Sequence, residues 1–326
     1  MSVPVSRFIW GRLPWYGVLI VLGAALAVLI ASKEEKKVGL PEDTIIDLAL
    51  RVLPLGIVGA RLYYVLFSLD RFRMNPVSIF YIWEGGLAIY GGLIFGGLTV
   101  FFFCRKRNLP IMKVLDIIVP GLALAQAIGR WGNYFNQEAY GLKISNPFFQ
   151  FFPVGVQIAE NGTLVWHLAT FFMESCLNLF IFFFLIWGRR KLFRREGDPF
   201  LIYGLLYASG RLIIENFRMD SLYLGSHIRV SQLLSVLLCM FILGLFFFRR
   251  FLKDSRKLTT SKWFFIIVTI LDGVAVVLYC FGYGTISISS VLSQTVFLSV
   301  YSFLSVLTAF LFYGRSNSAE VCYANH

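Results

Sequence analysis

Long apolar segments recur along the chain, and short stretches with polar and charged residues separate them. A helix needs about 20 mostly apolar residues to cross the hydrocarbon core of a membrane, and nine segments approach that length. The spans that this pattern predicts are 15–32, 44–67, 84–104, 112–130, 169–188, 199–216, 229–248, 262–281 and 287–313. The chain is therefore predicted to be an all-α polytopic membrane protein.

A basic linker, RRFLKDSRKLTTSK, separates the first seven predicted spans from the last two. We expect residues 1–258 to form a seven-helix core, and residues 259–326 to form a C-terminal extension with about two extra transmembrane helices. The longest connection, residues 133–168, contains Pro, Gly and many aromatic residues. We expect this connection to lie on the membrane surface or to form a small external cap.

Composition supports the membrane assignment, and the charge distribution orients the chain. The 326 residues are 58% hydrophobic and 15% charged, whereas soluble domains carry about 25% charged residues. Most Lys and Arg residues fall in alternate connections, so the positive-inside rule places the N-terminus outside. The net charge of +12 then reflects topology and attraction to anionic lipid, and no nucleic-acid partner is expected.

The common signatures of soluble enzymes are missing from the sequence. It contains no GxxxxGK[ST], GxSxG or HExxH motif, which argues against the usual ATPase, α/β-hydrolase and zinc-protease classes. The five cysteines show no CxxC spacing and are expected to be small hydrophobic residues in packed helices. We therefore expect no metal site and no cofactor.

The stretch GRWGNYFNQEAYG, residues 129–141, places many polar groups at the outer end of the fourth predicted span. A charge at the centre of a membrane helix costs about 2.5–3.5 kcal/mol. Arg130 alone is explained by a side chain that reaches the membrane surface beside the anchor Trp131. Asn133 and Glu138 are among the polar residues that follow, and such a cluster around a guanidinium suits a phosphate better than a lipid boundary.

A second polar cluster lies at the end of the sixth predicted span. Arg211, Glu215 and Arg218 have the spacing i, i+4, i+7, which places them on one face of a continuous helix. One interpretation is a buried structural ion pair, since Glu215 can pair with either arginine. The other is an anion site, because one carboxylate between two guanidinium groups leaves a net positive charge.

Other polar positions are more open to interpretation. Asp47 and Arg51 have i, i+4 spacing and are expected to form a structural pair, whereas Arg61 fits either a structural or a functional role. Tyr90 stands among glycines, so it either belongs to a packed helix contact or points into a cavity. Tyr16 follows a tryptophan at the mouth of the first span, which is typical of an aromatic belt.

Taken together, these motifs resemble the prolipoprotein diacylglyceryl transferases of bacteria. The resemblance is carried by residues 129–138 with Gly141, by residues 15–17, 59–61 and 84–87, and by the stretch from Tyr203 to Gln232, and it covers about residues 8–250. It implies a seven-helix transferase core in the bacterial cell membrane, with lipid entering from the side. Residues 259–326 lie outside the resemblance.

The resemblance also implies an activity. Members of this family transfer the diacylglyceryl group from phosphatidylglycerol to the thiol of the lipobox cysteine in a preprolipoprotein. A thioether forms and glycerol phosphate is released. The partners that the resemblance implies are therefore phosphatidylglycerol, lipobox peptides and the lipid bilayer.

Individual roles follow from the family motifs. The residues expected to take part in the chemistry are Arg211, Arg130, Glu138 and Tyr90, and those expected to bind phosphatidylglycerol are Arg130, Asn133, Tyr16, Glu215 and Arg218. We expect Arg130 to anchor the phosphate and Arg211 to stabilise its departure, because fixed cations lower a barrier when they bind the leaving anion better than the ground state. The acceptor of the thiol proton stays open among Tyr90, Glu138 and a phosphate oxygen.

The chain departs from the family pattern in two places. Many members have His where this chain has Tyr90, and the usual HPTFLYES stretch reads LATFFMES here, with Glu174 retained. These changes bear on the local geometry of the fifth predicted span. Two other functions therefore stay open, a membrane transporter or channel for an anion, and an inactive lipid-binding homologue.

Overall fold

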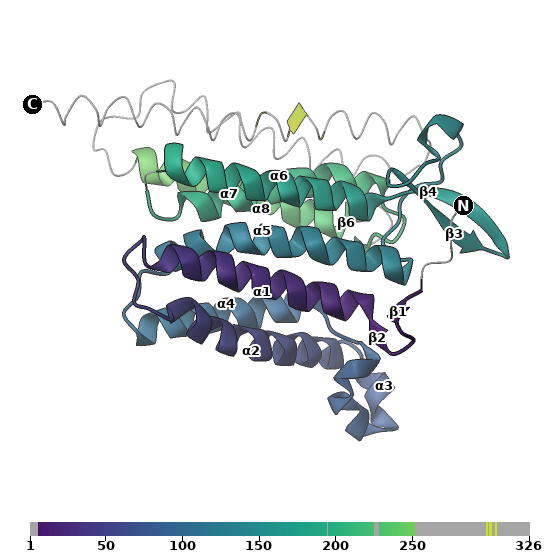
Figure 1. The fold of residues 1–326 in the computed structure, drawn as a ribbon, viewed down its shortest axis with the longest axis horizontal. Helices are drawn as coiled ribbons and strands as arrows, with labels where there is room; N and C mark the ends of the chain where they lie inside the picture. Colours follow the sequence, from purple (N-terminus) through teal and green to yellow (C-terminus); the bar gives the residue numbers. More distant parts are fainter. Residues whose placement is uncertain are drawn as a thin grey trace, which may run out of the picture. The chain divides into compact units, whose positions relative to one another are not determined.

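The computed structural model describes residues 6–193, 195–224 and 228–251, together with the single positions 298, 300, 301 and 304. The described chain is mostly helical (Figure 1). The α-helices are α1 Trp15–Glu35, α2 Thr44–Leu66, α3 Leu69–Arg73, α4 Ile89–Lys106, α5 Ile111–Asn136, α6 Thr170–Lys191, α7 Asp198–Ile214 and α8 Val230–Phe251. Apart from the four single positions, the two predicted spans 262–281 and 287–313 lie outside the described residues.

Short elements connect these helices. The 3-10 turns are η1 Pro76–Phe80, η2 Ile82–Glu84, η3 Pro147–Phe149 and η4 Glu215–Phe217. Three antiparallel pairs are formed by β1 Phe8–Ile9 with β2 Leu13–Pro14, β3 Gly155–Glu160 with β4 Thr163–Leu168, and β5 Tyr223–Leu224 with β6 Ile228–Arg229. The β3–β4 hairpin occupies the connection that was expected to form a surface segment or cap.

Four of the described helices are long and apolar enough to cross a membrane. They are the segments Trp15–Glu35, Ile89–Lys106, Ile111–Asn136 and Thr170–Arg189, while the apolar part of α8, Val230–Phe246, is shorter. Helix α2 is apolar over most of its length but carries Asp47, Arg51 and Arg61. The chain is thus a multi-pass, predominantly α-helical membrane protein.

The helix boundaries differ from the predicted ones where the backbone is irregular. The span expected from residue 84 begins at Ile89, because η2 and the positive φ values of Gly85 and Gly86 precede it. Helix α5 continues to Asn136, so most of the polar motif is helical. Helix α7 ends at Ile214 and Arg218 has an extended backbone. The expectation that Arg218 continues one helical face is therefore wrong.

The chain divides into two compact units, and helices α1 and α5 each contribute to both. One unit comprises Met1–Gly23, Ala123–Phe193 and Pro199–His326, and the other comprises Ala24–Leu122 with Arg194–Asp198. In the second unit, α2 and α4 pack closely through glycines, since a Cβ added to Gly91 would lie 2.2 Å from the carbonyl oxygen of Gly59. Such small residues let membrane helices approach each other.

Candidate functional site

The C-terminal end of α5 packs against α1 through small residues, and this packing fixes the helix that carries Arg130. A Cβ added to Gly132 would lie 2.4 Å from Tyr16 Cδ2, and one added to Gly129 would lie 3.2 Å from Ile20 Cδ1. Beside this contact, Trp15 stacks on Phe135 with ring centroids 4.8 Å apart. The absence of a side chain at Gly132 therefore allows the ring of Tyr16 to pack on the helix, and Gly129 allows Ile20 to do the same.

The loop after α5 holds Glu138 in a strained turn. Gln137 and Ala139 on either side have φ of 52° and 54°, a left-handed conformation that L residues adopt at an energetic cost. The amide of Glu138 donates to the carbonyl of Asn133 at 3.0 Å, and Thr170 Oγ1 donates to the carbonyl of Ala139 at 2.6 Å. These bonds keep the turn in one shape at the start of α6.

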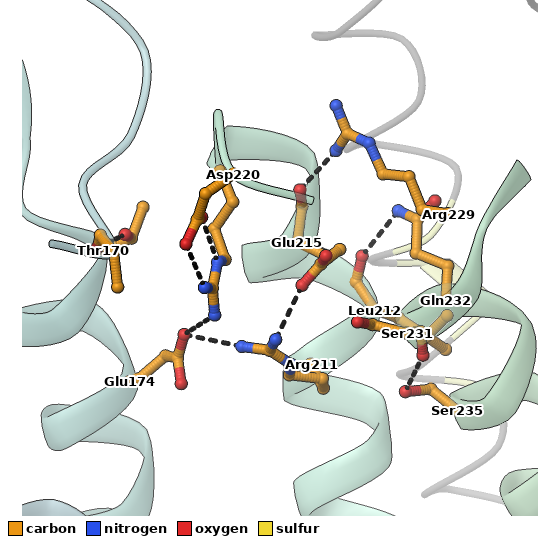
Figure 2. Close-up of polar contacts among 12 residues, drawn as sticks. Thr170, Glu174, Arg211, Leu212, Glu215, Asp220, Arg229, Ser231, Gln232 and Ser235 are labelled. Atoms are coloured by element: carbon orange, nitrogen blue, oxygen red, sulfur yellow. Dashed lines mark hydrogen bonds and ion pairs between the residues drawn. The ribbon is translucent and has the colours of Figure 1, made fainter. Parts of the chain in front are cut away.

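Three arginines from separate elements converge on Glu174 in the second turn of α6. Arg130 Nη2 lies 2.5 Å from Glu174 Oε2, and Arg211 Nη1 lies 2.6 Å from Oε1. Arg218 Nη1 lies 3.2 Å from Oε1. Figure 2 shows Glu174 and Arg211 pointing toward each other from their helices. The structure thus brings Arg130, Arg211 and Arg218, which belong to two separate sequence motifs, together around one carboxylate.

Two further carboxylates complete the cluster. Glu215 Oε2 lies 2.9 Å from Arg211 Nη2, and its side chain is 1% exposed. Arg218 Nε and Nη2 donate to the two oxygens of Asp220 at 2.9 and 2.8 Å. Burial alone would raise the pKa of Asp220, but the pair with Arg218 lowers that pKa below its ordinary value. Arg211 and Arg218 therefore each have a carboxylate partner in addition to Glu174.

Arg229 of β6 and Gln232 of α8 hold the backbone of residues 212–216 (Figure 2). Arg229 Nη1 donates to the carbonyl oxygen of Glu215. Gln232 Nε2 donates to the carbonyl of Leu212 at 3.2 Å and to Asn216 Oδ1 at 2.6 Å. The end of α7 and the turn η4 are thereby fixed, which holds the side chains of Arg211 and Glu215.

Hydrogen bonds between α5 and α6 hold the helix that carries Glu174. Trp131 Nε1 donates to Ser175 Oγ at 3.1 Å, and Ser175 Oγ donates to the carbonyl of Ala127 at 2.9 Å. Asn178 Nδ2 donates to the backbone carbonyl of Glu174 at 2.8 Å. The tryptophan of the GRWG motif therefore orients the fifth predicted span, although its sequence departs from the family pattern.

His167, at the end of β4, is fully buried and forms a hydrogen bond between Nδ1 and the carbonyl of Gly141 at 2.8 Å. Its Nε2 lies 3.1 Å from Glu160 Oε1, and Lys143 Nζ lies 2.6 Å from Glu160 Oε2. The hydrogen bond from Lys143 lowers the pKa of Glu160 below its ordinary value. This histidine therefore ties the loop after Glu138 to the β3–β4 hairpin.

The remaining predicted residues occupy different places. Asn133 is buried on α5, and Tyr16 is 39% exposed beside Gly132. Glu138 Oε1 accepts a hydrogen bond from Asn136 Nδ2 at 3.1 Å. Tyr90 lies at the start of α4 in the other compact unit, where its ring is tilted against Tyr63 at a centroid distance of 6.3 Å. Tyr90 is thus not part of the group that the first unit assembles around Glu174.

Arg61, which the sequence left ambiguous, has a structural position in the second unit. Its guanidinium donates to the carbonyls of Ser78, Ile79, Tyr81, Gly85 and Gly86 at 2.6–3.4 Å. The Asp47–Arg51 pair is looser than expected at 3.9 Å, and Asp47 instead contacts Arg107 closely.

Sequence reasoning missed the roles of three residues, and two of them left a signal. Glu174 is one of the residues retained in the altered stretch LATFFMES, and Asp220 follows two positions after Arg218 in the second polar cluster. Thr170 is retained in the same stretch, but its contact with the carbonyl of Ala139 could not be predicted from the sequence, because it spans 31 positions and depends on tertiary structure.

The arrangement is suited to an anion. The side chains of Arg130, Arg211 and Arg218 are 22%, 16% and 12% exposed, so the guanidinium groups are poorly solvated but still reachable. Converging guanidinium groups provide directed donors that match phosphate oxygens. Among the described residues, no group of three or more His, Cys, Asp or Glu side chains has a geometry suited to a metal ion.

Comparison with known proteins agrees with this chemistry. The family "Prolipoprotein diacylglyceryl transferase" matches residues 5–249. Proteins named phosphatidylglycerol–prolipoprotein diacylglyceryl transferase are similar to this chain: one from Enterococcus faecalis is 46% identical over 259 residues, covering 76% of this chain and 93% of the relative. One from Shouchella clausii is 41% identical, covering 75% and 89%, and one from Clostridium botulinum is 42% identical, covering 74% and 94%. The chain belongs to the prolipoprotein diacylglyceryl transferase family.

Proposed function

We propose that this protein transfers the diacylglyceryl group of phosphatidylglycerol to the lipobox cysteine thiol of preprolipoproteins. One observation carries the proposal: Arg130, Arg211 and Arg218 each lie within 3.2 Å of a carboxylate oxygen of Glu174. Relatives covered over most of their length carry names that state phosphatidylglycerol and prolipoprotein. The three arginines supply the phosphate site that such a donor lipid requires.

The reaction is a displacement at carbon. The thiol loses its proton, and the sulfur electron pair forms a bond to the terminal carbon of the diacylglyceryl group, because thiolate is the competent nucleophile. The bond from that carbon to the phosphate oxygen breaks, and its electron pair leaves with glycerol phosphate. The leaving phosphate gains one negative charge, so donors fixed around it stabilise the transition state more than the ground state.

The position of each residue in the site indicates its role in the reaction. Arg130, the most exposed of the three arginines, anchors the phosphate of the incoming lipid. Arg211, whose Nη2 pairs with Glu215 Oε2 at 2.9 Å, stabilises the departing phosphate. Asn133 of α5 and Tyr16 of α1, which packs against Gly132, contribute to lipid binding. Glu138, Tyr90 and a phosphate oxygen remain the candidates for the acceptor of the thiol proton.

The same proposal includes the number of membrane-spanning helices and their orientation in the membrane. The seven long helices α1, α2 and α4–α8 form the transferase core of residues 1–258, with the N-terminus outside and residues 133–168 as an external loop. Residues 259–326 form an extension with two further transmembrane helices. The protein resides in the bacterial cell membrane, and phosphatidylglycerol reaches the arginines from the outer leaflet.

The test is a transfer assay with purified protein, phosphatidylglycerol and a synthetic lipobox peptide. Mass spectrometry should detect a diacylglyceryl adduct on the peptide cysteine, and Arg130→Ala and Arg211→Ala should each reduce its rate at least about a hundredfold, as loss of a transition-state donor does. Arg73→Ala, which removes an exposed arginine paired with Asp70, should leave the rate unchanged. Absence of an adduct from folded protein, or anion flux into vesicles without transfer, would contradict the proposal.

A further inference from the structure

Glu174 is the carboxylate that the three arginines of the site share. Its side chain is only 3% exposed, and burial of a carboxylate is unfavourable unless cations and hydrogen bonds compensate it. The second turn of α6 and the Trp131–Ser175–Ala127 hydrogen bonds fix its backbone. Glu174 therefore occupies the centre of the anion site as part of the protein.

The two carboxylate oxygens of Glu174 contact different arginines. Oε1 accepts from Arg211 Nη1 at 2.6 Å and from Arg218 Nη1 at 3.2 Å. Oε2 lies 2.5 Å from Arg130 Nη2. A change at Oε2 can therefore free Arg130 while the contacts of Oε1 keep Arg211 and Arg218 in place.

The other carboxylates do not share this arrangement. Glu215 pairs with Arg211, and Asp220 pairs with Arg218. Within the described part of the chain, the ion pair that Arg130 forms is the one with Glu174. Since Arg130 is also the most exposed of the three, it is the arginine for which an incoming anion and Glu174 compete directly.

We propose that Glu174 is a positioning residue, a built-in counterion whose Oε2 holds Arg130 in place until a phosphate oxygen of the lipid replaces it. This inference rests on the proposed function. It assigns Glu174 two effects: it aligns the arginines before the lipid binds, and it weakens the site's hold on phosphate. The second effect favours release of glycerol phosphate, since Glu174 Oε2 returns to Arg130 when the product leaves.

The variant Glu174→Gln separates charge from shape. The amide oxygen still accepts from one arginine, but the negative charge that competes with phosphate is gone. We expect KM for phosphatidylglycerol and the inhibition constant of glycerol 1-phosphate to fall about tenfold, as removal of a neighbouring like charge predicts. We expect kcat to fall as well, because the product then dissociates more slowly. A residue with a merely structural role would raise KM or leave it unchanged.

Binding is measured separately from transfer. The thermal midpoint of the full-length protein in detergent is recorded with increasing inorganic phosphate and, in parallel, glycerol 1-phosphate, because a ligand that binds the folded state raises this midpoint. Glu174→Gln should respond at lower ligand concentration than wild type. Glu174→Asp keeps the charge but is too short to reach Arg130 and Arg211 together, so it should lie between the two. The matched control is Glu42→Gln, which removes an exposed carboxylate paired with Lys36.

Each outcome decides the inference. Tighter anion binding in the order wild type, Glu174→Asp, Glu174→Gln supports it, and if Glu174→Gln does not fold, Glu174→Asp against wild type gives the same answer. Equal or weaker binding in the variants overturns it, as does an equal change in Glu42→Gln. If wild type binds these anions but transfers no lipid, the proposed function fails, and the order of binding still tests the role of Glu174.

Discussion

At the residue scale, Gly132 shows how one missing side chain shapes the site. Its position on α5 faces the ring of Tyr16, and a Cβ there would lie 2.4 Å from Tyr16 Cδ2. Real Cβ atoms do not approach so closely, so a larger residue must move the ring or the helix. Gly132 therefore links the GRWG motif to the aromatic residues at the start of α1.

We predict that Gly132→Ala displaces Tyr16 and reduces transfer at least about tenfold, with a stability loss of about 1–3 kcal/mol from overpacking. The transfer assay and the thermal midpoint measure the two effects. Gly97→Ala on α4 is the matched control, because a Cβ added there meets no atom within 4 Å apart from the nearby backbone of its own helix, and alanine favours helix. Normal transfer by Gly132→Ala would show that the contact is not required.

The loop residue Gln137 offers a second test at this scale. Its φ of 52° is a conformation that glycine adopts without strain, whereas other L residues are strained in it by about 1 kcal/mol. We predict that Gln137→Gly retains or slightly raises thermal stability, while Gln137→Val lowers it. A lower midpoint for the glycine variant would mean that the side chain of Gln137 stabilises the turn more than its backbone strain destabilises it.

At the element scale, the loop before α4 depends on one side chain from α2. Arg61 is 7% exposed and donates to five carbonyl oxygens of residues 78–86. The loop has little regular structure of its own beyond η1 and η2. Its carbonyls therefore obtain from the guanidinium the partners that a helix or sheet would otherwise supply.

We predict that Arg61→Lys lowers the free energy of unfolding by about 1–3 kcal/mol, because an ammonium group cannot reach five acceptors and leaves partly buried carbonyls without donors. Denaturation in detergent measures the change. Arg51→Lys is the control, since Arg51 is about half exposed and donates to the carbonyl of Asp47. Equal stability of wild type and Arg61→Lys would refute the structural role.

Acid sensitivity is a further property of the elements that follow α7. The folded-state pKa of Asp220 is lowered by its pair with Arg218, so this pair contributes its full stability above the unfolded pKa of about 3.9. That contribution is lost as the pH falls through the lower folded-state pKa. We predict that Asp220→Asn destabilises the protein at pH 7 but loses less stability than wild type below about pH 4, as midpoints measured across this range will show.

The helices were predictable, whereas the arrangement at Glu174 was not. Spans such as α1 and α6 follow from runs of apolar residues whose length matches the membrane. The end of α7 at Ile214 was missed because Arg218 keeps helical spacing in sequence, while its ion pairs with Glu174 and Asp220 hold an extended backbone. Arg130 and Glu174 are brought together by packing of α5 on α6, which local patterns do not encode.

At the scale of the whole molecule, the family match ends at residue 249, but the first unit includes residues beyond it. Leu298 and Tyr301, 1% and 4% exposed, form a buried cluster with Leu212 of α7 and Val236 of α8. Leu212 directly follows Arg211, whose guanidinium belongs to the anion site. Residues outside the family region thus support the helix that positions a site arginine.

We therefore predict that Leu298→Ala lowers stability by about 2 kcal/mol or more, because it leaves a cavity against Leu212 and Val236. It should also reduce kcat several-fold, since the end of α7 then holds Arg211 less firmly and catalytic groups tolerate little misplacement. Val300→Ala, at a position 53% exposed, is the control and should change neither quantity. A loss of stability with unchanged kcat would show that the extension stabilises the fold without influencing the site. If Leu298→Ala changed neither stability nor kcat, the proposed support of α7 by the extension would be wrong.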